Sequence, residues 1–284
     1  MSASWKRSLL AAILIGASTA VLAEDIDLFV GAAPPTAADA PNVLIIMDNT
    51  ANWNSAFANE RAALASVLSG LTQDRFKVGL MMFSETGVGN SSPDGGYVRA
   101  ALRLMNATNK PLYQSLINSL HVNNDKSNGG KLGLTMAEAY YYFSGASAYA
   151  GHNKAKRDYA GNSVAGYLPS NAVYALAGNA FDSSASAIYQ NPVDSGCQKN
   201  FIIYISNGAV QDNSSDTSAA NTKLAAAGGS TAQITLSPSG SQANAADEWV
   251  RFMATTAPTK VVTYTIDVNP VSTGQGPGFT ALLK

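Results

Sequence analysis

Cysteine and histidine are scarce in this chain of 284 residues, which has one cysteine and two histidines. A single thiol at Cys197 excludes an internal disulfide, so it either pairs with a cysteine outside this chain or is a buried, inert side chain. The two histidines, His121 and His152, are isolated in the sequence. We interpret them as surface residues rather than metal ligands.

Charge is also scarce, since 13% of the residues are charged and the formal net charge is −1. Without a basic surplus, nucleic acid and anionic lipid are not expected partners. The composition is that of a globular protein with a full core. The sequence therefore predicts one sizeable domain.

Long apolar runs are missing as well, with one short exception near the start. Lys6 and Arg7 precede the apolar run Leu9–Ala17, and Val21-Leu22-Ala23 follows it. The run is shorter than the roughly 20 residues that a membrane span needs. The pattern indicates a secretory signal peptide over residues 1–23, cleaved after Ala23. The mature chain is expected to be exported, to the periplasm or beyond, with no membrane span.

The most informative stretch is the apolar run Val43–Met47, which is typical of a strand buried on both faces of a parallel sheet. Asp48, Thr50 and Asn52 follow at alternating positions. Bound molecules and ions lie just beyond the carboxyl ends of such strands. The side-chain oxygens of these three residues are the kind that coordinate hard divalent cations. An ordinary turn is the alternative, because Asp and Asn are common turn formers.

Strand and helix patterns alternate along the rest of the chain. They predict an α/β fold: a doubly wound, mostly parallel sheet with helices on both faces. Buried strands are expected near residues 76–83, 200–205 and 260–267, an antiparallel edge strand near 97–104, and helices near 55–71, 112–120, 132–143 and 247–255. On the first helix, Glu60 and Arg61 are expected on the face away from the core.

Two motifs in this order resemble those of the von Willebrand factor A domain. Asp48-x-Thr50-x-Asn52 is similar to the Asp-x-Ser-x-Ser motif of that family, and Ser206-Asn207-Gly208 is similar to its Thr-Asp-Gly. The resemblance implies a Rossmann-like fold with a degenerate metal-ion-dependent adhesion site at Asp48, Thr50, Asn52 and Asn207. The expected cation is Mg²⁺, or else Ca²⁺ or Mn²⁺.

The family also has a loop threonine in its metal site, and here the chain departs from the pattern. Gly130 or Lys131 stands at that position, and neither supplies a hydroxyl. Thr135 follows about one helical turn later, too far on to be the expected replacement. An alternative hypothesis places the Lys131 ammonium against Asp48, in a site without metal.

The start of the mature chain, Glu24–Phe29, followed later by Pro41-Asn42-Val43-Leu44-Ile45, resembles the N-terminus of PilY-type proteins of type IV pili. That resemblance implies a non-enzymatic adhesion module that supports pilus assembly and surface attachment at the pilus tip. Minor pilins and a host or surface ligand are the expected partners. The predicted organisation is a signal peptide (1–23), an N-terminal extension and linker (24–40), and a von Willebrand A-like domain (41–284).

A long insertion, residues 144–198, is rich in small and polar residues and is expected to be either a recognition surface or a solvated loop. By the same resemblance, the family's final helix and edge strand are expected to be truncated in this chain, which would leave a strand edge open for pairing. Two other functions stay in view. One is a free-standing secreted A-domain binder unrelated to pili. The other, less favoured, is an exported α/β hydrolase, although the chain lacks Gly-x-Ser-x-Gly.

Overall fold

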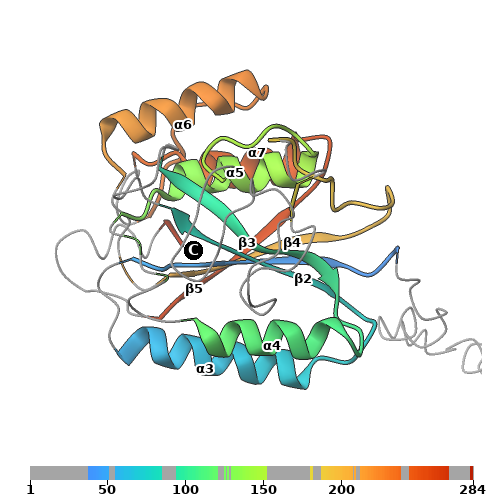
Figure 1. Ribbon diagram of the computed structural model, residues 1–284. Helices are drawn as coiled ribbons and strands as arrows, with labels where there is room; N and C mark the ends of the chain where they lie inside the picture. Colours follow the sequence, from blue (N-terminus) through green and yellow to red (C-terminus); the bar gives the residue numbers. More distant parts are fainter. Residues whose placement is uncertain are drawn as a thin grey trace, which may run out of the picture. The chain divides into compact units, whose positions relative to one another are not determined.

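A computed structural model gives the fold of the domain (Figure 1). It describes residues 38–50, 55–84, 94–120, 125, 127, 129–151, 180–181, 187–206, 208, 212–237, 243–268 and 282–283. Within these ranges, no helix has the length and apolar character needed to cross a membrane. The expected signal peptide and both histidines lie outside the described residues.

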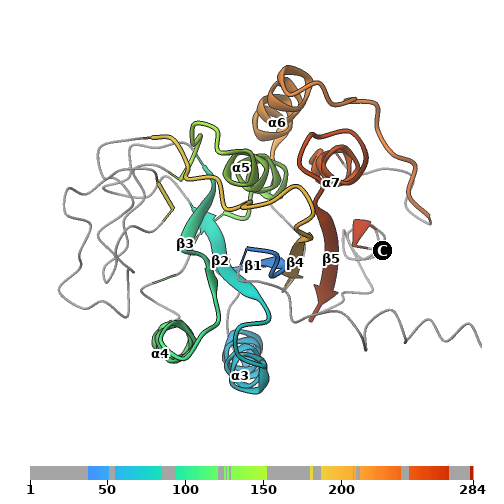
Figure 2. The ribbon, with the colours of Figure 1, turned by 90° about the vertical axis from the view of Figure 1, so that its right-hand side faces the viewer.

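The centre of the domain is a five-stranded sheet with the order β3-β2-β1-β4-β5 (Figure 2). The strands are β1 (Asn42–Met47), β2 (Lys77–Ser84), β3 (Gly95–Leu104), β4 (Asn200–Ser206) and β5 (Val262–Asp267). β1 is parallel to both of its neighbours, β4 is parallel to β5, and β3 is antiparallel to β2. The predicted mostly parallel sheet, with an antiparallel strand at one edge, is confirmed.

Helices cover both faces of the sheet, as predicted (Figures 1 and 2). They are α3 (Ser55–Gly70), α4 (Asn109–Ser119), α5 (Leu132–Ser144), α6 (Ser214–Ala226) and α7 (Ala246–Thr255). On β1, Leu44 and Ile46 belong to the core beneath α5, α6 and α7, whereas Ile45 and Met47 belong to the core beneath α3 and α4. A strand packed on both faces explains the unbroken apolar run.

Helix α6 was not predicted, since a polar loop was expected after β4. Its apolar stripe is short: Ala220 and Leu224 are its buried residues. The local signal is a capping box, in which the Asn213 side chain accepts hydrogen bonds from the first turn and Asp216 bonds back to the Asn213 N–H. This pairing satisfies N–H groups that a helix start otherwise leaves open.

Strand β5 lies at the opposite edge of the sheet from β3, and the prediction that it is a buried strand is wrong. Val262, Tyr264 and Ile266 are 42%, 58% and 47% exposed. They are in register with the β4 residues that face α3, but no helix of the described residues lies beneath β5 on that side (Figure 2). An apolar sequence was therefore not sufficient to indicate burial.

The base of the 144–198 insertion belongs to the core. Its two ends pair through the Ala148 N–H to Ala187 O and Tyr189 N–H to Ala146 O hydrogen bonds. The buried Glu138 carboxylate of α5 accepts hydrogen bonds from backbone N–H groups of residues 149–151 and from the Tyr189 hydroxyl. The expectation of a solvated loop is thus wrong for these ends, while residues 152–179 and 182–186 lie outside the described part.

Cys197 lies near the end of this insertion and is an exposed, free thiol. The interpretation of this residue as a buried, inert side chain is therefore wrong. Pairing with a cysteine outside the chain stays a prediction.

Candidate functional site

The candidate site begins where β1 ends. The Asp48 carboxylate is 2% exposed, and its Oδ1 accepts hydrogen bonds from the Thr50 N–H (3.0 Å) and from Thr50 Oγ1 (2.8 Å). Because the Thr50 hydroxyl donates to Asp48, its oxygen keeps lone pairs for a further contact. Of the four predicted ligands, the structure brings Asp48 and Thr50 together. Asn52 and Asn207 lie outside the described residues, so their role stays a prediction.

Between these two residues, Asn49 joins three segments that are distant in the sequence. Its Oδ1 accepts the Phe83 N–H (2.7 Å), and its Nδ2 donates to Phe83 O (2.9 Å) and Asp125 O (2.8 Å). Its own carbonyl accepts the Ser127 N–H (2.7 Å). Sequence reasoning passed over Asn49, because its partners are 34 and 76 residues away.

The loop before α5 packs against this turn, and its residues Asp125 and Ser127 are fully buried. Thr50 and Ser127 form a β-bridge. A Cβ on Gly130 would lie 2.8 Å from the Thr50 Cγ2 and 3.1 Å from the Phe83 ring, so only glycine allows this approach. Asp125 is held by a fully buried ion pair with Arg99 of β3, with 3.6 Å between Nε and Oδ1.

Two hypotheses about this loop can be compared with the structure. Thr135 donates its hydroxyl to Lys131 O (2.8 Å) within α5, so that hydroxyl proton is used inside the helix. The Lys131 ammonium lies 2.8 Å from the Asp216 carboxylate at the start of α6. The hypothesis that pairs Lys131 with Asp48 therefore gains no support from this ion pair.

Asp212 is a further acidic residue near this loop, and the sequence-based prediction missed it. Its carboxylate accepts the N–H groups of Leu132 (3.0 Å) and Gly133 (3.1 Å) at the start of α5. Burial raises the pKa of Asp212 to about 7, although these N–H groups favour the charged form. Asp212 therefore ties the segment after β4 to the helix that follows the glycine loop.

Glu60 of α3 was expected on the outer face of its helix, and this prediction is wrong. The residue is 6% exposed, and neither carboxylate oxygen has a hydrogen-bond partner among the residues that the structure describes. Burial, followed by the charge of Asp48, raises its pKa to about 8. The available signal was its spacing, three residues after Phe57 and four before Leu64, which are both buried.

These residues fit a divalent cation. The Asp48 and Glu60 carboxylates and the Thr50 hydroxyl are the hard oxygen donors that Mg²⁺, Ca²⁺ and Mn²⁺ take. Unpartnered carboxylate oxygens in a buried place, close enough to a second carboxylate to feel its charge, call for a proton or a cation. Among the described residues there is no cluster of three or more His, Cys, Asp or Glu side chains suited to a metal. Further ligands would be neutral oxygens or water.

Comparison with known proteins adds little to this picture. No family model matches the sequence. No curated protein matches it either. Solved structures that align with it include proximal thread matrix protein 1 of the mussel byssus, at 8% identity and a TM-score of 0.35, and the same protein with a zinc-occupied MIDAS motif, at 12% and 0.34.

Each of these alignments covers 66% of this chain and 35% of the mussel protein. Scores this low carry no weight for fold or function. The doubly wound α/β assignment therefore stands on the strand order and the helices on both faces.

Replacing Glu60 by Gln tests the buried carboxylate. The Glu60 carboxyl binds its proton more tightly in the folded wild type than in the unfolded chain. The wild-type free energy of unfolding therefore falls as pH rises from 4.5 towards about 8. The neutral amide lacks this loss, so the stability of the variant relative to the wild type should rise by roughly 2–4 kcal/mol near pH 8. This is below the full value at about 1.4 kcal/mol per pKa unit, because solvent screens part of the charge. Urea unfolding across this range, with a chelator present, measures the effect. Parallel pH profiles for Glu60→Gln and wild type would contradict the assignment.

Proposed function

We propose that this chain is an exported, non-enzymatic protein-binding module that holds a divalent cation at the carboxyl end of β1. Mg²⁺ is the expected ion, with Ca²⁺ and Mn²⁺ as alternatives. The observation that carries the proposal is the pair of buried carboxylates, Asp48 and Glu60, beside a turn closed by Thr50. Asn52 and Asn207 are the further predicted ligands.

The cation would supply a positive charge that accepts an oxygen from a partner protein. The chain's own residues do the positioning. Asp48 orients the Thr50 hydroxyl, Asn49 fixes the turn on β2, and Gly130 leaves room for the neighbouring loop.

The resemblance to PilY-type proteins supports a more specific proposal. In this proposal the module acts at the outer surface or the pilus tip, where it supports type IV pilus assembly and surface attachment. Minor pilins and a host or surface ligand are its proposed partners. The supporting residues are Glu24–Phe29 together with the Pro41–Ile45 stretch.

Calorimetric titration of the mature chain with Mg²⁺, Mn²⁺ and Ca²⁺ tests the cation. We expect saturable binding by the wild type. Asp48→Ala should weaken it by more than the roughly 10- to 100-fold that loss of a supporting residue costs at a metal site. Glu60→Gln should weaken it in the same direction.

Asp74→Asn is the matched control, because this exposed turn residue has φ 61°, which Asn also accepts. It should bind like the wild type. Equal binding by wild type and a folded Asp48→Ala variant would overturn the cation site.

A genetic experiment tests the pilus role. Cells that lack this gene should carry fewer pili and attach less to surfaces, and the wild-type gene or Asp74→Asn should restore both. Asp48→Ala should not restore attachment. Piliation and attachment that are unchanged by the deletion would contradict the pilus role, while the titration would still judge the cation site by itself.

A further inference from the structure

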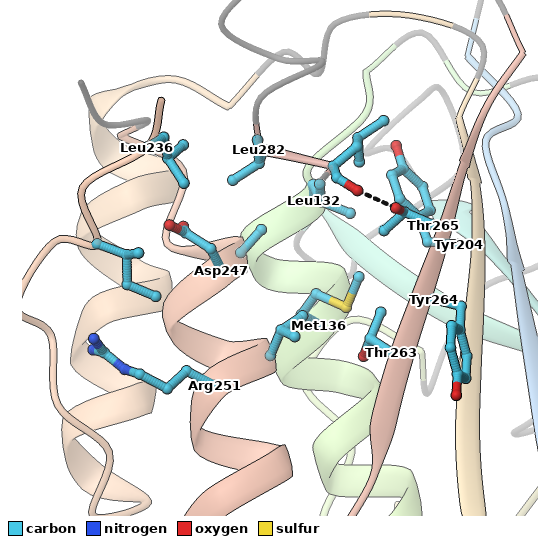
Figure 3. A pocket seen from close by; sticks show the side chains of 14 residues that line it. Leu132, Met136, Tyr204, Leu236, Asp247, Arg251, Thr263, Tyr264, Thr265 and Leu282 are labelled. Atoms are coloured by element: carbon cyan, nitrogen blue, oxygen red, sulfur yellow. Dashed lines mark hydrogen bonds between the residues drawn. The ribbon is translucent and has the colours of Figure 1, made fainter. Parts of the chain in front are cut away.

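A second polar site lies on the face of the sheet that α5 and α7 cover. There a cavity of about 480 Å³ opens between these helices and β5 (Figure 3). Its apolar lining includes Leu132, Met136, Leu236, Val250 and Leu282. This volume and this lining are typical of sites for small ligands.

The outer wall of this cavity is fixed by polar side chains of α7. The Glu248 carboxylate accepts the Ile234 N–H (2.8 Å). The Arg251 guanidinium donates to Ser230 O (3.2 Å) and Ala232 O (3.0 Å). These bonds hold the segment before Leu236 across the helix, so the cavity has a built wall and is not a gap beside a free loop.

Some polar atoms on the walls have no hydrogen-bond partner among the described residues. Both oxygens of the Asp247 carboxylate are buried and accept no hydrogen bond of normal geometry from the described residues, although the backbone N–H groups of residues 247 and 248 lie near enough to favour the charged form. The buried Thr263 hydroxyl has no partner in the described part of the chain either. Asp247 comes from α7 and Thr263 from β5, across the cavity (Figure 3). Such groups are costly to bury unless something donates to them.

Asp247 lies in the first turn of α7, where the helix dipole favours a negative charge. Burial raises the pKa of Asp247 to about 7, and the adjacent Glu248 adds to this effect. A positive group in the cavity would therefore stabilise the Asp247 carboxylate, while an anion would be repelled by it. The Arg251 guanidinium also lines the cavity, but it donates to Ser230 O and Ala232 O. An uncharged apolar ligand would leave the carboxylate buried and unpaired.

We propose that this cavity binds a small amphipathic amine, with its ammonium group at the Asp247 carboxylate and its apolar body against the leucine and methionine side chains. The Thr263 hydroxyl offers a second polar contact from the opposite wall. This site uses none of the residues proposed to hold the divalent cation, so it does not depend on the proposed function.

Hexylamine is the probe, with hexanol and hexanoate as ligands of matched chain length. Calorimetry and thermal unfolding of the mature chain near pH 8 should show saturable hexylammonium binding, at least tenfold weaker binding of hexanol, and no binding of hexanoate. Asp247→Asn should reduce hexylammonium binding to the level of hexanol.

Two further variants complete the test. Asp74→Asn changes an exposed carboxylate elsewhere and should bind like the wild type. Leu236→Trp, at a half-buried position of the wall, should fill the cavity and abolish binding of hexylammonium and hexanol. Equal affinity of the wild type for hexanol and hexylammonium would overturn the proposal. So would unchanged binding in Asp247→Asn, or the absence of saturable binding in a folded wild type, which would mean that the cavity holds only water.

Discussion

The candidate site depends on the buried side chain of Asn49. This side chain forms three hydrogen bonds: two to the backbone of Phe83 at the end of β2, and one to Asp125 in the loop before α5. Each bond satisfies a backbone group that would otherwise be buried and unpaired. Because the same residue stands between Asp48 and Thr50, its fixed position also fixes theirs. A smaller side chain there would separate the strand end, its neighbour and the glycine loop.

Acidic side chains have two different roles in the described part of the domain. The buried Glu138 and the half-buried Asp212 accept hydrogen bonds from backbone N–H groups, so they join segments of the fold. The carboxylate oxygens of Glu60 and of the half-buried Asp247 are themselves buried, and they accept no hydrogen bond of normal geometry from the residues that the structure describes. The second pair is therefore the better indicator of ligands, because a structural role accounts for the first pair and leaves the second unexplained.

Much of the fold could be predicted from the sequence. The unbroken apolar run from Val43 to Met47 was enough to place β1 inside a parallel sheet. What failed depended on distant contacts. β5 has an apolar sequence, yet its exposure follows from the absence of a covering helix in the described residues. Helix α6 has too short an apolar stripe to show periodicity.

The site could be predicted only in part, for the same physical reason. Asp48 and Thr50 are two residues apart, so their local turn is readable from the sequence. Glu60 is buried because α3 packs on the sheet, and the Asn49 side chain forms hydrogen bonds with residues of two other segments. A charged residue next to Arg61 in a helix is ordinarily an exposed one. The opposing signal was the spacing of Glu60 from Phe57 and Leu64, and the structure shows that Glu60 is buried like them.

The proposed divalent cation between Asp48 and Glu60 can be located with Mn²⁺. Crystals of the mature chain grown or soaked with Mn²⁺ would be measured for anomalous scattering. We predict one strong peak within coordination distance of the Asp48 carboxylate, the Thr50 hydroxyl and the Glu60 carboxylate, and its loss in Asp48→Ala crystals. A map without a peak between Asp48 and Glu60, from crystals in which Mn²⁺ binds elsewhere, would rule out this cation site.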